Sequence, residues 1–239
     1  MAYEWLLLDA DGTLFDYDAA ERQALTKTWN EFGLRFAPEV LTTYRQINAR
    51  VWRELERGEI AAEQLKVERF TRLFDAREIP IRGDEPERFA VQYLHNLGMC
   101  TDMIDGAEVV LRALAPRVNL ALITNGLTLV QRSRLVKSGL APLFRAVVIS
   151  EEEGVAKPDP RIFEIALERM GHPDRETVLM VGDSLSSDML GAARSGIDTC
   201  WFNPVGRPRD PQIDVTYEIR TLDELLQVVN SPASYPTEA

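Results

Sequence analysis

Short apolar runs alternate with longer amphipathic segments along most of the 239-residue chain. The first run, residues 5–8 (WLLL), contains no polar position, which predicts a strand buried on both faces, as in a parallel sheet. Similar runs predict further strands at 120–124, 146–150, 178–181 and 199–202. Amphipathic patterns between them predict helices at 107–114, 127–138, 160–170 and 185–195. Strands that alternate with helices indicate βαβ units, and therefore an α/β fold with a parallel sheet.

One interval is far longer than a single crossover helix requires. About 110 residues separate the first two predicted strands, and this interval carries four amphipathic patterns, at 19–32, 39–57, 61–77 and 85–97. The simplest interpretation is a helical domain, residues 17–97, inserted after the first strand of a core that comprises residues 1–16 and 98–230. We expect hinges at 15–17 and 97–102, and a disordered tail at 231–239.

Composition and charge narrow the class of partner. The 38 acidic residues outnumber the 27 basic ones, for a net charge of −11, which disfavours binding to a nucleic acid polymer or an anionic membrane. The first residues lack the basic segment of a signal peptide, and their apolar run is too short to span a bilayer. Cys100 and Cys200 are too few and too far apart for a disulfide framework. We therefore expect free, buried thiols and a cytoplasmic location.

Four polar clusters fall where predicted strands end, the edge at which ligands bind in an open α/β sheet. The first, residues 9–13 (DADGT), places Asp9 and Asp11 two positions apart behind a buried strand. Carboxylates in such a place need a partner or a metal, and oxygen ligands suit Mg²⁺. Asp9 can act as a nucleophile, and Asp11 can exchange a proton with a leaving oxygen and with water. The alternative is a plain β-turn that caps the next helix.

The second and third clusters supply groups that can bind a phosphate. Thr124 ends a predicted strand and Asn125 follows it, and both can contact phosphate oxygens, although for this cluster taken alone a helix N-cap is the favoured explanation. Lys157 precedes Pro158-Asp159-Pro160, and these prolines stiffen the entry into the next helix. Lys157 can then face the charge of a transition state, or it can be an ordinary solvated lysine in a loop.

The fourth cluster is residues 182–188 (GDSLSSD), after the predicted strand at 178–181. Asp183 stands at a strand end, as Asp9 does, and can ligate a metal. Asp188 lies in the first turn of the next helix, where it can orient either a metal-bound water or Lys157. Its alternative role is to stabilise the helix dipole.

In this order, each at a strand end, the clusters resemble the four motifs of the haloacid dehalogenase superfamily of aspartate-nucleophile hydrolases. The matching positions are D-x-D-G-T at 9–13, hydrophobic-Thr-Asn at 123–125, Lys157, and G-D-x-x-x-x-D at 182–188. The resemblance reaches to about residue 229. It implies a Rossmann-like core with an inserted helical cap of the C1 type.

The resemblance also implies a role for each motif residue. These roles are nucleophile and Mg²⁺ ligand for Asp9, acid/base group with a metal-bound backbone carbonyl for Asp11, phosphoryl binding for Thr124 and Asn125, charge neutralisation for Lys157, metal ligation for Asp183, and accessory ligation or support of a ligand for Asp188.

Other reactions of the superfamily fit less well. Dehalogenases typically lack an acidic residue at the position of Asp11. Sugar-phosphate mutases use a histidine early in the cap, whereas the histidines here are His95 and His172. Phosphonate hydrolysis requires a cap lysine that forms a Schiff base, and Lys27 and Lys66 are better explained by solvated helix faces.

The cap and the segment around Lys157 are similar to the bacterial pyrimidine 5′-nucleotidase branch. The similar positions are Asn48, Trp52, 58–60 (GEI), Leu65, 69–70 (RF) and 150–163 (SEEEGVAKPDPRIF). This resemblance implies a (deoxy)pyrimidine nucleoside monophosphate as substrate, with Asn48, Trp52 and Arg69 as candidate specificity residues. The alternatives are a phosphatase of sugar phosphates or other small phosphoesters, a phosphomutase, and a catalytically idle regulatory module. We expect a monomer or weak dimer.

Overall fold

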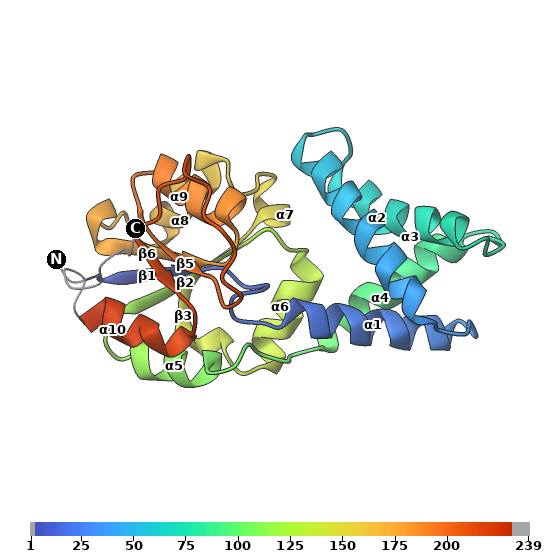
Figure 1. The fold of residues 1–239 in the computed structure, drawn as a ribbon, viewed down its shortest axis with the longest axis horizontal. Helices are drawn as coiled ribbons and strands as arrows, with labels where there is room; N and C mark the ends of the chain where they lie inside the picture. The colour runs from blue at the N-terminus through green and yellow to red at the C-terminus, as the bar shows by residue number, and fades with distance from the viewer. Residues whose placement is uncertain (1–2, 231–239) are drawn as a thin grey trace. The chain divides into compact units, whose positions relative to one another are not determined.

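A computed structural model describes residues 3–230 and contains a six-stranded parallel sheet (Figure 1). Its strands are β1 (Trp5–Leu8), β2 (Asn119–Thr124), β3 (Phe144–Ile149), β4 (Val178–Gly182), β5 (Asp198–Phe202) and β6 (Tyr217–Ile219), in the spatial order β3-β2-β1-β4-β5-β6. β1 lies between β2 and β4, so that Leu8 pairs with Leu122 on one side and Val181 on the other. The α/β fold with a parallel sheet is confirmed, and the five predicted strands are present.

The sixth strand, β6, was not predicted. It has only three residues, of which Tyr217 and Ile219 are buried and Glu218 between them is half-buried. A run this short cannot display a recognisable period in the sequence. β6 forms because its two buried side chains extend the core at the edge of the sheet beside β5.

Successive residues of β1 point to opposite faces of the sheet, and both faces are covered. Leu6 and Leu8 pack in one cluster with α5 (Ala107–Leu114) and α10 (Leu225–Asn230). Trp5 and Leu7 pack in a second cluster with α8 (Pro160–Arg169) and α9 (Leu190–Arg194). The uninterrupted apolar run of β1 is therefore the consequence of burial on two sides. Further helical elements around the sheet are α6 (Thr128–Lys137), α7 (Ser150–Glu153), η1 (Ala141–Leu143), η2 (Arg175–Thr177) and η4 (Leu222–Glu224).

The helix predicted at 185–195 is an α-helix only in its second half. A π-helical turn, η3 (Leu185–Met189), comes first and α9 follows it. Ser184 closes this turn, because its hydroxyl accepts from the Ser187 amide at 3.2 Å and its carbonyl accepts from the Asp188 amide at 3.0 Å. Single π turns are frequent at functional sites, and this one carries Asp188.

A second compact unit, residues 18–100, is helical. The first unit comprises residues up to 17 and from 101 onward. The four predicted helices are present as α1 (Tyr17–Glu31), α2 (Pro38–Glu56), α3 (Ala62–Ala76) and α4 (Glu85–Met99). Aromatic side chains form the centre of this unit, among them Trp29, Tyr44, Phe70, Phe74, Phe89 and Tyr93. The domain boundaries expected from the sequence stay a prediction, and the expected disordered tail at 231–239 lies outside the described residues.

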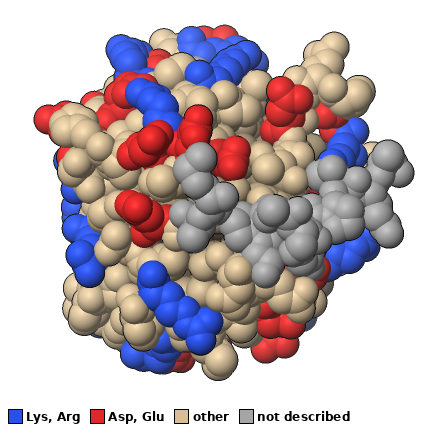
Figure 2. Space-filling view, turned by 90° about the vertical axis from the view of Figure 1, so that its left-hand side faces the viewer, with Lys and Arg blue, Asp and Glu red and all other residues tan. Residues whose placement is uncertain are grey.

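The two cysteines differ in how deeply they are buried. Cys200 is buried as expected, whereas Cys100, at the end of α4, is only partly buried, which corrects the expectation for that residue. Within residues 3–230, no helix combines the length and apolarity needed to cross a bilayer. On the face shown in Figure 2, basic and acidic side chains are intermixed, so the visible part of this face carries charges of both signs.

Truncating a β1 side chain tests the two-sided burial. Leu7 is completely buried, and we expect Leu7→Ala to lower the free energy of unfolding by about 2–5 kcal/mol, through lost apolar contact and the remaining cavity. Leu129→Ala on α6 is the matched control, because Leu129 is 59% exposed and its truncation should cost no more than about 0.5 kcal/mol. Urea denaturation followed by circular dichroism measures both. Equal costs for the two variants would contradict the packing described.

Candidate active site at the carboxyl ends of the strands

The loop that follows β1 is closed on itself and fixes Asp9 at its start. The Asp9 amide donates to the Val181 carbonyl of β4 at 2.9 Å, and the amides of Leu14 and Phe15 both donate to the Ala10 carbonyl at 2.9 Å. Gly12 permits this turn with φ of +86°, and a Cβ at Gly12 would lie 3.0 Å from the Asp183 carboxylate. The sequence DADGT therefore brings the loop and the end of β4 into direct contact.

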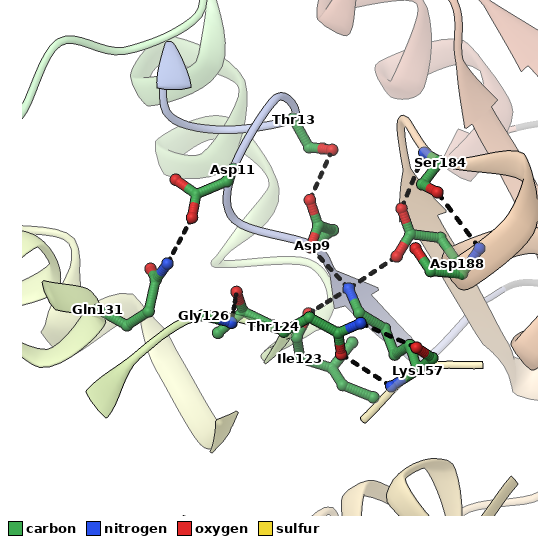
Figure 3. A network of polar contacts seen from close by, with 12 residues as sticks. Asp9, Asp11, Thr13, Ile123, Thr124, Gly126, Gln131, Lys157, Ser184 and Asp188 are labelled. Atoms are coloured by element: carbon green, nitrogen blue, oxygen red, sulfur yellow. Dashed lines mark hydrogen bonds and ion pairs between the residues drawn. The ribbon is translucent and has the colours of Figure 1, made fainter. Parts of the chain in front are cut away.

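Lys157 is buried at the centre of the site (Figure 3). Its Nζ lies 2.6 Å from Asp9 Oδ1 and 2.7 Å from Asp188 Oδ1, and it donates to the Ile123 carbonyl at 2.9 Å. The alternative interpretation of Lys157 as a solvated loop residue is wrong, because only 1% of its side chain is exposed. An ammonium group buried this deeply is stable because two carboxylates and a carbonyl surround it.

Asn125 fixes the backbone of Lys157. The Lys157 amide donates to Asn125 Oδ1 at 2.8 Å, and Asn125 Nδ2 donates to the Lys157 carbonyl at 2.8 Å. Thr124 is buried beside it, and its hydroxyl accepts from the Gly126 amide at 3.2 Å. Neither residue caps α6, whose N-cap is Leu127, so the helix-cap alternative is wrong. The side-chain contacts of Asn125 tie β2 to the segment that carries Lys157.

Asp183 and Asp188 approach from the end of β4. Asp188 is buried, and its Oδ2 accepts from the Ser184 amide at 3.0 Å. A Cβ at Gly182 would lie 2.3 Å from this same oxygen, so only glycine leaves room for Asp188. Asp183 is held through its carbonyl, which accepts from Trp201 Nε1 at 2.9 Å and from Arg207 Nη2 at 2.6 Å.

Three carboxylates meet in a geometry that can hold a cation. Asp9, Asp183 and Asp188 each offer an oxygen, and these oxygens all lie within 4.8 Å of one another. An all-oxygen donor set suits a hard divalent cation such as Mg²⁺. Asp188 is compatible with both roles expected from the sequence, since it also contacts Lys157. The Asp11 side chain, whose backbone was the expected third ligand, is not part of this set.

The charges of Asp9, Asp183 and Asp188 also favour the binding of a cation. Burial raises the pKa of Asp9 to about 8; the Lys157 ammonium opposes this rise, and the Asp188 and Asp183 carboxylates add to it. Burial, together with Asp188, raises the pKa of Asp183 to about 6. Burial alone would lower the pKa of Lys157, but Asp188 and Asp9 outweigh it and raise the pKa above its ordinary value. A bound divalent cation would favour the ionised form of these carboxylates, because its charge offsets both the cost of burial and their mutual repulsion.

Asp11 lies apart from this cluster, although it follows Asp9 by only two residues. Its side chain points toward α6 (Figure 3). There Oδ2 accepts from Gln131 Nε2 at 2.5 Å, and Oδ1 is paired with Arg134 Nη1. The two carboxylates of the first motif are therefore held by different partners.

The candidate specificity residues lie in the helical unit. Arg69 is buried, donates to Asn48 Oδ1 at 3.3 Å and stacks over the rings of Phe70 and Tyr93. Trp52, in contrast, is half-buried. Their expected role toward a substrate stays a prediction.

Several contacts within the site were not predicted from the sequence. Thr13 donates to Asp9 Oδ2 at 3.2 Å, and Gln131 and Arg134 hold Asp11. Arg207, on the loop after β5, contacts Asp183. The spacing of Gln131 and Arg134 indicates that both side chains lie on one face of the predicted helix, because residues three apart share a face. Nothing in a single sequence shows that this face is buried.

Comparison with known proteins identifies the family. A family model described as a haloacid dehalogenase-like hydrolase matches residues 3–196. The chain therefore belongs to the haloacid dehalogenase-like hydrolases, and the resemblance inferred from its motifs is confirmed. It is 34% identical over 229 residues to the pyrimidine 5′-nucleotidase YjjG of Escherichia coli (strain K12), covering 96% of this chain and 99% of that protein. It is 36% identical over 233 residues to the pyrimidine 5′-nucleotidase PynA of Streptococcus pneumoniae (strain ATCC BAA-255 / R6), covering 96% of each.

A solved structure of similar sequence supports the fold over nearly all of this chain. The HAD-hydrolase YfnB from Bacillus subtilis, whose crystal structure is described as bound to magnesium and as revealing interdomain movement, is similar with a TM-score of 0.88. It is 34% identical, and the match covers 96% of this chain and 100% of that one.

The raised pKa values predict that magnesium binding depends on pH. Below about pH 8 Asp9 holds a proton in the metal-free protein, and below about pH 6 Asp183 does so too, so binding must release protons. We expect Mg²⁺ affinity to increase as pH rises from about 5.5 to 8.5 and to level off above that range. Calorimetric titration in buffers of different ionisation enthalpy measures affinity and proton release together. An affinity that does not change across this range would contradict the assignment, and Asp183→Asn serves as the weakened-site control.

Proposed function

We propose that this protein is a magnesium-dependent phosphomonoester hydrolase that passes the phosphoryl group through an aspartyl-phosphate on Asp9. The observation that carries the proposal is the buried pair of Lys157 and Asp9, inside a group of three carboxylates at the strand ends. A buried ammonium beside a carboxylate nucleophile offers positive charge where a phosphoryl group must collect. The membership in a hydrolase family agrees with this chemistry.

The first half-reaction forms the covalent intermediate. An Asp9 carboxylate oxygen attacks phosphorus while the bond from phosphorus to the ester oxygen breaks. Asp11 donates a proton to that departing oxygen, which leaves as an alcohol. Lys157 favours the ionised form of Asp9 and balances charge on the transferring group, and Asp188 in turn holds Lys157.

The second half-reaction restores the enzyme. Asp11, now ionised, takes a proton from a water molecule whose oxygen attacks the same phosphorus. The bond between phosphorus and Asp9 breaks, inorganic phosphate leaves, and Asp9 is a carboxylate again. Asp11 finishes protonated, ready for the next substrate.

Magnesium fits the donor set of Asp9, Asp183 and Asp188, which contains only oxygen atoms at mutual distances below 4.8 Å. When bound, it would draw negative charge from the phosphoryl oxygens and favour the ionised form of the carboxylates. The relative YfnB is described as bound to magnesium, which supports the same assignment in this chain.

The favoured substrate class is a (deoxy)pyrimidine nucleoside 5′-monophosphate. The support is similarity over nearly the full length to two proteins named pyrimidine 5′-nucleotidase. Asn48, Trp52 and Arg69 stay candidate specificity residues. A cytoplasmic location and a monomeric or weakly dimeric state stay predictions.

A substrate panel with an inactive control tests the proposal. Phosphate release with Mg²⁺ is measured on pyrimidine and purine nucleoside monophosphates, sugar phosphates and other small phosphoesters. We expect pyrimidine nucleotides to be preferred, and Asp9→Asn to lower turnover by at least about 10⁴-fold, because the amide is a poor nucleophile. Asp105→Asn changes an exposed aspartate in the same way and should retain full activity. Preference for a sugar phosphate would keep the mechanism and refute the substrate class, whereas full activity of Asp9→Asn would refute the mechanism.

Metal removal gives a separate test. Chelation with EDTA followed by gel filtration should abolish phosphate release, and added Mg²⁺ should restore it. The reason is that the three clustered carboxylates and the phosphoryl group lack the balancing charge of the cation when it is removed. Circular dichroism before and after chelation shows whether the fold is retained. Unchanged turnover in the stripped protein would rule out metal dependence.

A further inference from the structure

Two buried side chains of α6 hold the carboxylate of Asp11. Gln131 and Arg134 are both fully buried, and each contacts a different oxygen of Asp11. They lie three positions apart, so they project from one face of the helix. The Asp11 side chain keeps 24% of its surface exposed.

The loops next to α6 leave room for Gln131 and contact Arg134. A Cβ at Gly126 would lie 2.3 Å from Gln131 Nε2, so the glycine before α6 leaves the space that Gln131 occupies. The Arg134 guanidinium lies 5.5 Å from the centre of the Phe15 ring. The Phe15 carbonyl accepts from the Gly12 amide at 2.9 Å, so α6 supports the loop that carries Asp11 as well as its side chain.

This arrangement leaves Asp11 able to act on a substrate. The two contacts from α6 use one lone-pair position on each carboxyl oxygen, so each oxygen keeps a second position. That position can carry the proton that Asp11 gives to the leaving oxygen, or accept a proton from water once Asp11 is ionised. In phosphoryl transfer the attacking and leaving oxygens lie roughly in line, on opposite sides of phosphorus. A group that protonates the leaving oxygen must therefore be kept away from the nucleophile. The contacts with α6 separate Asp11 from Asp9 in this way.

We propose that Arg134 and Gln131 are positioning residues that fix the Asp11 carboxylate for proton transfer to the leaving group. The inference rests on the proposed function, and it assigns a task to a buried arginine and a buried glutamine that the proposed mechanism itself does not use. The competing explanation is that both side chains only stabilise the loop. That explanation predicts equal losses on every substrate.

The test compares substrates that differ in their need for a proton. The value of kcat/KM reports on the steps up to departure of the leaving group, and it is measured for 5′-dUMP, or the fastest alkyl phosphate of the panel, and for p-nitrophenyl phosphate. The nitrophenolate ion leaves without protonation, whereas an alkoxide does not. We expect Arg134→Met to lower kcat/KM by about 10- to 100-fold on the alkyl phosphate and by less than about threefold on p-nitrophenyl phosphate. Arg134→Lys should recover part of the loss.

Three further variants make the comparison decisive. Arg132→Met alters an arginine of the same helix that pairs with Glu152 instead, and it should behave as wild type. Gln131→Leu removes the other contact and should show the same selective loss, to a smaller extent, which keeps the test available if Arg134→Met does not fold. In an Asp11→Asn background, Arg134→Met should cause almost no additional loss on either substrate, because its effect passes through Asp11.

The outcomes separate the inference from the proposed function. Selective loss on the alkyl phosphate that disappears in the Asp11→Asn background supports the positioning role. Equal losses on both substrates, or a full further loss in the Asp11→Asn background, would overturn the positioning role and leave the proposed function intact. Absence of Asp9-dependent turnover in the wild-type protein would overturn both.

Discussion

The buried ammonium group of Lys157, paired with Asp9 and Asp188, is the interaction on which the arrangement of the site depends. A buried charge is tolerated only if its partners are held firmly in place. The surrounding sequence meets this requirement at three strand ends: Asn125 fixes the Lys157 backbone, Gly182 leaves room for Asp188, and the Asp9 amide is bonded to β4. Each of these constraints holds one member of the buried group in place, so disturbing any of them would weaken the pairing of Lys157 with its carboxylates.

The parallel sheet makes this convergence possible and also makes it predictable. Because parallel strands present their carboxyl ends at one edge, residues more than 100 positions apart in sequence meet there, as Asp9 and Lys157 do. The apolar runs located five of the six strands, and the polar clusters that follow four of these runs pointed to the site. Burial on both faces of the sheet is what made those runs recognisable.

Other features of the structure correspond to no recognisable pattern in the sequence. β6 is held by two side chains at the sheet edge, which is a tertiary contact and leaves no period in three residues. The π turn at Leu185–Met189 depends on hydrogen bonds of Ser184, whereas the local pattern was that of an ordinary helix. Gln131 and Arg134 are polar residues on an amphipathic helix, and burial beneath a loop that folds back from β1 is what distinguishes them from solvated ones. In each case the deciding partner is distant in sequence.

The local geometry of the loop after β1 lets two aspartates of one short motif take different roles. Side chains two positions apart in a continuing strand would point to the same face and repel each other. Here the strand ends at Leu8, so Asp9 and Asp11 lie in the turn that follows it, which Gly12 continues with a positive φ that other residues rarely adopt. One carboxylate then meets Lys157 in the buried cluster, and the other meets Arg134 at the partly exposed margin. The two carboxylates have different cationic partners, so the motif can place a nucleophile and a proton-transfer group within three residues with little mutual repulsion.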